Sequence, residues 1–145
     1  MAAGTLVTAS SDERAKGQSA PVARIQTATL SWATGAGFAA QTSTVFVSGT
    51  IYRMDVVIST VTGNADLVAA ITCADDNGCV FGNELDHAAQ AHSATHYYDS
   101  QSSKDDDGNF NPVTHHGNIT VTVTPNEDAG GTAQTLSVTV IFFVR

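Results

Sequence analysis

The segments ITVTVT (residues 119–124) and TLSVTV (residues 135–140) decide the fold class, because apolar and hydroxyl side chains alternate in both. Successive side chains of a β-strand point to opposite faces, so this alternation gives one apolar face and one face of Thr and Ser. The polar stretch between them contains Gly130-Gly131, which predicts a hairpin loop. We therefore expect two antiparallel strands that are buried on one face and solvated on the other.

The same period of two recurs upstream, whereas the 3.6-residue period of an amphipathic helix is not sustained anywhere in the sequence. Asn77-Gly78 tolerates positive φ in a tight turn, so residues 79–81 are expected to return beside the preceding strand. The expected strands cover residues 5–9, 27–32, 42–48, 50–60, 66–73, 79–81, 119–124 and 135–144. This spacing predicts an all-β protein whose residues 24–145 form an antiparallel β-sandwich, jelly-roll or immunoglobulin-like.

Composition limits the class of function. The 145 residues carry a formal net charge of -8, and the six Lys and Arg residues are scattered singly, so no basic stripe could follow a nucleic-acid backbone. No segment approaches the roughly 20 apolar residues that a membrane-spanning helix needs. Residues 1–11 lack the charged start and apolar run of a secretory signal, so we expect synthesis in a cytoplasm. The sequence thus predicts no nucleic-acid partner and no membrane partner.

Two regions depart from the strand pattern. Residues 1–23 are small and polar, with a charge cluster that includes Arg14 and Lys16, and cannot bury enough apolar area to fold alone. We expect them to form a flexible N-terminal arm. Residues 83–117 are rich in His, Ser, Asp and Asn and exceed the usual length of a loop, which predicts a long surface insertion that carries contacts.

Cys73 and Cys79 flank a turn-forming run. If the flanking segments pair as a hairpin, the two thiols face each other and a disulfide is geometrically possible. Synthesis in a reducing cytoplasm favours the alternative, in which both thiols are reduced and packed as small apolar groups. The spacing excludes a CxxC redox or zinc motif.

The insertion holds all five histidines and an acidic run, and both could contribute metal ligands. His92 and His96 would share one face of a helix, but the His-Glu-x-x-His zinc signature is absent. Asp105 and Asp107 belong to a fragment that resembles a calcium loop, in which His116 stands where the closing glutamate should be. Solvated loop side chains are the ordinary alternative for these four candidates, so the sequence predicts no metal and no cofactor.

Catalytic signatures are absent from the sequence: it contains no nucleophile elbow, phosphate-binding glycine loop or dinucleotide fingerprint. We therefore expect no catalytic residues and no enzyme activity. Tyr97 and Tyr98 are the candidates for surface recognition, because amphipathic aromatic residues dominate interface hot spots.

The last strand ends in a run that is apolar on both faces: Ile141, Phe142, Phe143 and Val144. Either this strand is central in its sheet, or another subunit buries its second face. Under the second alternative these residues form an assembly interface together with Arg14 and Lys16 of the arm.

Several short motifs occur in an order that resembles a known family. They are Thr29-Leu30-Ser31-Trp32, Val47-Ser48-Gly49-Thr50-Ile51-Tyr52-Arg53, Asp75-Asp76-Asn77-Gly78 and the final Phe142-Phe143-Val144-Arg145. In this order they are similar to small structural proteins of tailed bacteriophages, which include capsid decoration and minor virion proteins. The insertion at residues 83–117 is longer and richer in His than this resemblance leads us to expect.

The resemblance implies a virion protein made in the host cytoplasm. We expect a capsid decoration protein that binds the major capsid protein on the outside of the head, as a homotrimer stabilised by multivalent contacts. A tail or fibre component and a carbohydrate-binding receptor-recognition module are the alternatives, the latter gripping a sugar through Tyr97, Tyr98 and the acidic run. A hydrolase would need a pocket with a strongly perturbed ionisable group, for which the sequence gives no indication.

Overall fold

The computed structural model describes residues 6–12, 24–79, 81, 85–99 and 113–145, and every structural statement below refers to these residues. They form strands and connections, with no helix in the described ranges. The strands are β1 (Leu6–Asp12), β2 (Arg24–Ala33), β3 (Gln41–Ile58), β4 (Val68–Ala74), β5 (His87–Ala91), β6 (Ala94–Asp99), β7 (Val113–Pro125) and β8 (Thr135–Val144). Within the described ranges there is accordingly no helix of the length and apolarity that crossing a membrane requires.

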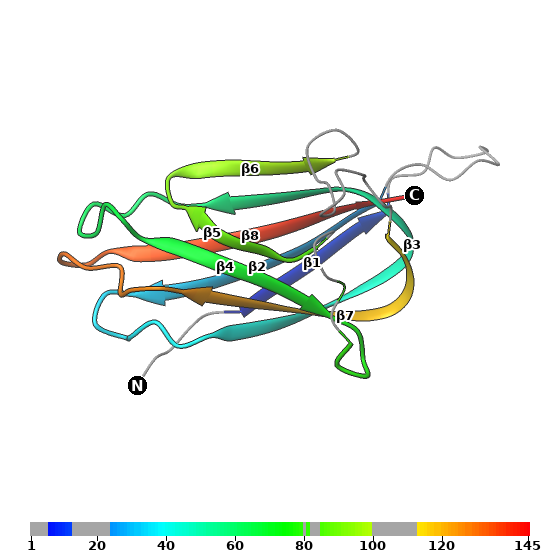
Figure 1. Cartoon of the computed structure of the whole chain (residues 1–145), viewed down its shortest axis with the longest axis horizontal. Coiled ribbons are helices and arrows are strands. Elements are labelled where there is room, and N and C mark those ends of the chain that lie inside the picture. Colours follow the sequence, from blue (N-terminus) through cyan, green and yellow to red (C-terminus); the bar gives the residue numbers. More distant parts are fainter. Residues whose placement is uncertain (1–5, 13–23, 80, 82–84, 100–112) are drawn as a thin grey trace.

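The eight strands make one antiparallel sheet that folds over on itself, and β3 belongs to both of its layers (Figure 1). The first part of β3 pairs with β7, and its second part pairs with β8 on one side and β6 on the other. One layer is therefore β1-β2-β8-β3-β6, and the opposing layer is β3-β7-β4-β5. This arrangement confirms the expected all-β, antiparallel β-sandwich.

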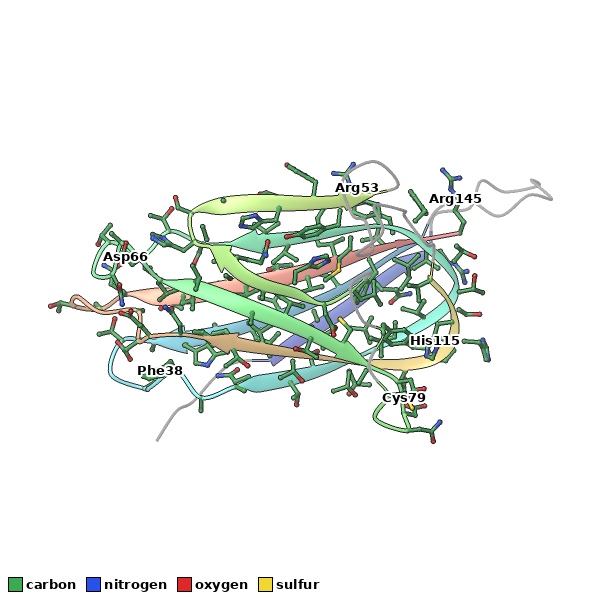
Figure 2. All side chains as sticks on the ribbon, viewed as in Figure 1. Phe38, Arg53, Asp66, Cys79, His115 and Arg145 are labelled. Carbon is green, nitrogen blue, oxygen red and sulfur yellow. The ribbon has the colours of Figure 1, made fainter. Side chains whose placement is uncertain are left out.

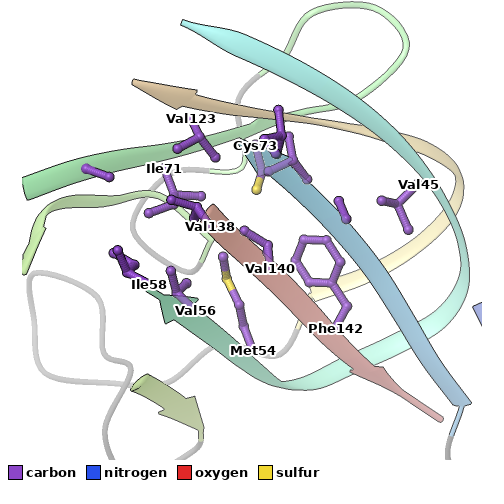
Figure 3. Close-up of a cluster of buried hydrophobic side chains, with 14 of the residues drawn as sticks. Val45, Met54, Val56, Ile58, Ile71, Cys73, Val123, Val138, Val140 and Phe142 are labelled. Atoms are coloured by element: carbon purple, nitrogen blue, oxygen red, sulfur yellow. The ribbon is translucent and has the colours of Figure 1, made fainter. Parts of the chain in front are cut away.

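The two layers enclose one apolar core, which takes its side chains from the inward positions of both (Figure 3). Trp32, Phe142 and Met54 come from one layer, and Ile71 and Val123 come from the other; all five are essentially inaccessible to solvent. The indole Nε1 of Trp32 donates a hydrogen bond to the carbonyl oxygen of Ala39 at 2.8 Å, so its burial leaves no polar atom unsatisfied.

The bend of β3 between the layers requires a glycine. Gly49 has a φ of 135°, and a Cβ atom at this position would lie 2.1 Å from the carbonyl oxygen of Arg145. Immediately after it, the main chains of Thr50 and Arg145 exchange two hydrogen bonds of 2.9 Å each. The bend in β3 is thereby fixed to the residue that follows β8.

Both expected irregular regions contain strands, which corrects the predicted domain layout. Residues 6–12 of the expected flexible arm form β1, which pairs along β2 and overlaps the strand expected at residues 5–9. The rest of the arm lies outside the described residues. The expected insertion contains β5, β6 and the first residues of β7. The strands in this insertion are short or polar, so they give little of the alternating pattern that makes a strand visible in a sequence.

Two further expectations about strands are wrong. Residues 42–48 and 50–60 were expected to form separate strands, but Gly49 bends the chain without ending β3. Residues 79–81 form no strand where they are described, but the expectation that they return beside the preceding strand is correct. The N–H of Asp75 donates to the carbonyl oxygen of Cys79 at 3.0 Å, and the N–H of Phe81 donates to that of Cys73 at 3.1 Å. The carboxylate of Asp75 also accepts from the N–H groups of Asn77 and Cys79, which makes this segment a compact turn.

An aromatic stack joins the two layers along the edge formed by β5 and β6. The rings of His87 and Tyr98 are parallel, with an interplanar angle of 7° and centroids 3.5 Å apart. His87 belongs to β5 in one layer and Tyr98 to β6 in the other, and the Tyr98 hydroxyl donates a hydrogen bond to the side-chain oxygen of Gln90. β5 and β6 thus connect the two layers at this edge of the sandwich.

A candidate binding surface

A group of aromatic and arginine side chains lies on the outer side of the β1-β2-β8-β3-β6 layer, and we call it the Arg53 face. It consists of Tyr52, Arg53, Asp55, Tyr97, Phe143 and Arg145. These residues come from β3, β6, the end of β8 and the residue that follows it. Figure 2 shows Arg53 and Arg145 at the same end of the molecule.

A β-bulge brings two consecutive residues of β3 to this surface. The register changes between Ile51, which is opposite Val144, and Arg53, which is opposite Phe143, so Tyr52 is the extra residue. A bulge interrupts the alternation of a strand and reorients its side chains. As a result Tyr52 and Arg53 both lie near Phe143, with ring centroids of Tyr52 and Phe143 6.3 Å apart.

The Arg53 guanidinium is held between a carboxylate and two rings. Its Nε and Nη2 atoms donate to the two carboxylate oxygens of Asp55 at 2.7 and 3.0 Å. The guanidinium carbon also lies 4.9 Å from the ring centroid of Tyr97 and 5.1 Å from that of Phe143, within the range of cation–π contacts. Asp55 occupies an outward strand position yet is only 6% exposed, whereas the Arg53 side chain is 38% exposed. The buried carboxylate holds the guanidinium through two hydrogen bonds.

Arg145 is positioned in a different way. Its guanidinium carbon lies 4.2 Å from the centroid of Tyr52, and its main chain is held by the two hydrogen bonds to Thr50. In the part of the chain that the structure describes, Arg53 and Asp55 make the only ion pair, so Arg145 has no carboxylate partner there. Arg145 is exposed, and its guanidinium lies beside the ring of Tyr52.

The surroundings of the Arg53 face are apolar. Ile25 is opposite Phe143 and Ile141 is opposite Asp55, and both isoleucines are half-buried on the same outer side. Val57 continues this row, and together with Tyr97 it is among the exposed large hydrophobic residues of the described chain. Farther along the layer the face becomes hydroxylic, where the Thr29 and Thr139 side chains lie within hydrogen-bonding distance at 3.0 Å.

Charged residues lie at both ends of the molecule. The arginines of the described ranges, Arg24, Arg53 and Arg145, gather around the bend of β3, where the Arg24 guanidinium donates to the carbonyl oxygen of Ser48. Asp66 lies at the opposite end (Figure 2), where a loop also carries Glu127 and Asp128. Acidic residues also lie among these arginines, because Asp55 belongs to the Arg53 face and the register places Asp99 opposite Arg53. Asp12 is likewise opposite Arg24.

The two tyrosines predicted for recognition point in opposite directions, as neighbours on one strand must. Tyr97 belongs to the Arg53 face and is 53% exposed. Tyr98 faces inward onto His87, and burial raises its pKa to about 12 because the phenolate would be poorly solvated there. The expectation that Tyr98 is a surface recognition residue is therefore wrong.

The predicted assembly residues of the last strand also divide between two faces. β8 lies between β2 and β3, so the central-strand explanation of its apolar ending is confirmed. Phe142 and Val144 belong to the core and cannot form an interface, whereas Ile141 and Phe143 are half-buried on the outer face. The other two predicted assembly residues, Arg14 and Lys16, lie outside the described residues.

The histidine candidates for metal binding make hydrogen bonds to the main chain instead. His92 Nδ1 accepts from the N–H of Val61 at 3.4 Å, and its Nε2 lies 3.1 Å from the carbonyl oxygen of Ala65. His96 Nε2 lies 2.9 Å from the carbonyl oxygen of Ala91. His92 lies in the connection between β5 and β6, and His96 lies in β6, so the helix that would have aligned them does not form.

No group of three or more potential metal ligands occurs in the described ranges. The other two candidates, Asp105 and Asp107, lie outside these ranges. Both cysteines are free in this structure: Cys73 is buried and Cys79 is exposed. Burial, with a smaller contribution from the charge of Asp86, raises the pKa of the Cys73 thiol well above its ordinary value.

Sequence reasoning missed Tyr52, Arg53, Asp55 and Arg145. Arg53 and Asp55 are two residues apart within an expected strand, so a shared face was available from the sequence pattern. Tyr97, Phe143 and Arg145 lie beside them because of the cross-strand register and the bulge. The periodicity of the sequence reveals neither the register nor the bulge.

No family model and no curated protein matches the sequence, so the similarity to tailed-phage structural proteins remains a resemblance of short motifs. Structural similarity is found to viral proteins and to carbohydrate-binding modules. The chain aligns over 99% of its length with the infectious bursal disease virus VP2 subviral particle, at a TM-score of 0.42 and 10% identity, and covers 33% of that chain.

A xylan-binding module, CBM86 from Roseburia intestinalis, aligns over 99% of this chain and 96% of its own, with a TM-score of 0.39 and 10% identity. The enzymatically active domain of tailspike protein 4 from bacteriophage CBA120 gives a TM-score of 0.37 at 7% identity. That alignment includes 99% of this chain but only 19% of the tailspike domain.

Proposed function

We propose that this chain is a structural protein of a tailed-phage particle that acts by binding, as a capsid decoration protein on the outside of the head. The observation that carries the binding role is the Arg53 face, a preorganised group of tyrosine, phenylalanine and arginine on the outer side of a rigid layer. Tyrosine and arginine are enriched among the residues that dominate protein interfaces. The motif resemblance to small phage structural proteins supports the assignment to a particle.

The physical role of such a protein would be to link neighbouring coat subunits. A decoration protein gains avidity when several modest contacts act together, which supports the further proposal of a homotrimer on a local symmetry axis of the head. In this proposal the major capsid protein and other copies of the chain are the partners. The function requires a stable body and an exposed contact surface, and no chemical step.

Binding to heads tests this function directly. Heads of the encoding phage, purified without this protein, should bind the added chain to saturation, and particle images should place it at repeated positions on the shell. Sedimentation equilibrium of the free chain tests the trimer. Failure to bind heads, or a location on the tail alone, would contradict the decoration role.

A carbohydrate-binding module is the second candidate, and the observation in its favour is the exposed ring of Tyr97. Such a module should bind a defined glycan on an array, and a chelator would remove the signal if the acidic run at residues 105–109 holds calcium. Under the decoration proposal no glycan is retained with or without chelator, so specific retention would favour the alternative.

A further inference from the structure

We propose that Asn77 is a modification site, which deamidates by cyclisation onto the main-chain nitrogen of Gly78 at a rate that Asp75 controls. The site lies in the turn that follows β4, where Figure 2 labels Cys79. The reaction needs only water as a second reactant, so it is independent of the proposed function.

Asn77 is the only asparagine of the sequence that precedes a glycine. Asparagine is a thermolabile residue, because its side-chain amide carbon can form a five-membered ring with the nitrogen of the next residue. A side chain on that next residue hinders ring closure, and glycine has none. The other asparagines of the described ranges precede Ala65, Ile119 and Glu127.

Ring closure forms a bond between the Gly78 nitrogen and the Cγ atom of Asn77. The bond between Cγ and Nδ2 of Asn77 breaks, and the amide group leaves as ammonia with the proton of the Gly78 N–H. Water then opens the resulting succinimide at either carbonyl carbon and gives aspartate or isoaspartate. No electrons pass to or from another molecule, so neither an oxidant nor a reductant is required.

The peptide bond between Asn77 and Gly78 is open to water, because both residues are exposed. Gly78 has a φ of 78°, in the left-handed region that glycine adopts without strain. A Cβ atom at Gly78 would have no heavy atom of the surrounding chain within 4 Å. The turn therefore leaves space beside this residue for the ring and for water.

Asp75 holds the main chain on both sides of this peptide bond. Its carbonyl oxygen accepts a hydrogen bond from the N–H of Gly78 at 3.0 Å. Its Oδ1 atom accepts from the N–H groups of Asn77 and Cys79 at 2.8 and 2.9 Å.

These hydrogen bonds oppose the reaction. The Gly78 nitrogen attacks only after it loses the proton that it donates to Asp75, and only after it turns toward the Cγ atom of Asn77. Both steps require the turn to open, so the rate in the folded chain depends on how often the turn opens. The carboxylate of Asp75 keeps the turn closed and thereby slows the reaction.

Conversion changes the turn in turn residue 77 itself. Either product adds a negative charge beside Asp75 and Asp76. Isoaspartate also inserts a methylene group into the main chain before Gly78, so the hydrogen bond from Gly78 to Asp75 loses its present geometry.

The test incubates the full chain at mildly alkaline pH, folded in buffer and unfolded in guanidinium chloride, and measures conversion at each asparagine by peptide mass spectrometry. Asp75→Ala removes the carboxylate that accepts from two N–H groups. Asp76→Ala is the matched control, because it removes the same charge from the same turn but none of the hydrogen bonds described above. Asn77→Gln identifies the signal, since its longer side chain does not form the five-membered ring. Thermal unfolding of each variant verifies that the fold is retained.

We expect the folded wild type to convert at Asn77 into both aspartate and isoaspartate, about threefold or more slowly than the unfolded chain. Asp75→Ala should convert faster than the wild type when folded, and at the same rate when unfolded. Asp76→Ala should match the wild type in both states.

Equal rates for the folded wild type and folded Asp75→Ala would overturn the control by Asp75. Equal rates for the folded and the unfolded wild type would overturn it as well, and this comparison needs no variant. Conversion of another described asparagine before Asn77, or aspartate as the sole product, would overturn the modification site. Absence of conversion in the folded wild type and in folded Asp75→Ala, while the unfolded chain converts, would also overturn it.

Discussion

Thr50 and Arg145 are joined by two main-chain hydrogen bonds, in which each N–H donates to the carbonyl oxygen of the other residue at 2.9 Å. This pair fixes the bend of β3 to the end of β8, and it also holds Arg145 where its guanidinium stacks on Tyr52. The fold and the candidate binding surface therefore depend on the same anchor. A change that loosens the bend should affect both stability and binding.

Gly49→Ala should show this dependence. A Cβ at Gly49 would lie 2.1 Å from the carbonyl oxygen of Arg145, and the φ of 135° is unfavourable for alanine. We expect the free energy of unfolding, measured by urea denaturation, to fall by roughly 3 kcal/mol or more. Gly35→Ala is the control, because Gly35 has a φ of 79° but open space around it, so only about 1–2 kcal/mol should be lost. Equal losses would contradict the proposed role of the bend.

Phe142 and Phe143 are neighbours with opposite roles, and truncating each should separate stability from binding. Phe142 is fully buried in the core, so Phe142→Ala should lower the free energy of unfolding by about 3–5 kcal/mol. Phe143 lies on the outer face beside Arg53, so Phe143→Ala should cost less stability and weaken partner binding. Chemical denaturation measures the loss of stability, and binding to purified heads measures the effect on partner binding. A larger loss of stability for Phe143→Ala would show that the side chains of β8 are assigned to the wrong faces.

Alternation in the sequence was sufficient to predict the fold class and most of the long strands. It succeeds where one face is buried and the other wet, as in Ile119, Val121 and Val123 against their threonine neighbours. It fails at β5, where a single buried histidine, His87, is followed by alanines and a glutamine. That strand is stabilised by pairing with β4 and by the ring of Tyr98, two contacts that local periodicity does not contain.

The candidate surface was predicted only in part, for a related reason. Tyr97 was identified as an aromatic residue suited to recognition, but its neighbour Tyr98 was assigned the same role although consecutive strand residues face opposite sides. Arg53 and Arg145 are far apart in the sequence, and the register of β3 and β8 places them on the same surface. Such a site is a property of the pairing pattern, and a single sequence gives no direct signal for it.

The two cysteines should react at very different rates with a thiol reagent. Burial raises the pKa of Cys73 and also blocks access to it, whereas Cys79 is exposed. We expect the native protein at mildly alkaline pH to be labelled at Cys79 alone, and the denatured protein to be labelled at both positions. Mass spectrometry of labelled peptides assigns the sites. If neither cysteine reacts until a reductant is added, a disulfide links them and the free-thiol arrangement is wrong.

Stability should decline in alkaline solution in a way that depends on Tyr98. Its folded-state pKa is raised to about 12 by burial, above the ordinary value near 10, so folding favours the protonated phenol. The stability that Tyr98 contributes is fully present below pH 10. It is lost as the pH rises from 10 toward 12, because in this range the hydroxyl of Tyr98 releases its proton in the unfolded chain but keeps it in the folded one. Tyr98→Phe keeps the stack on His87 and removes the ionisable hydroxyl, so its urea midpoint should vary less over this range than that of the wild type. Tyr97→Phe, at an exposed position, serves as the matched control. Equal declines of the urea midpoint in the wild type and in Tyr98→Phe would show that Tyr98 does not link folding to pH.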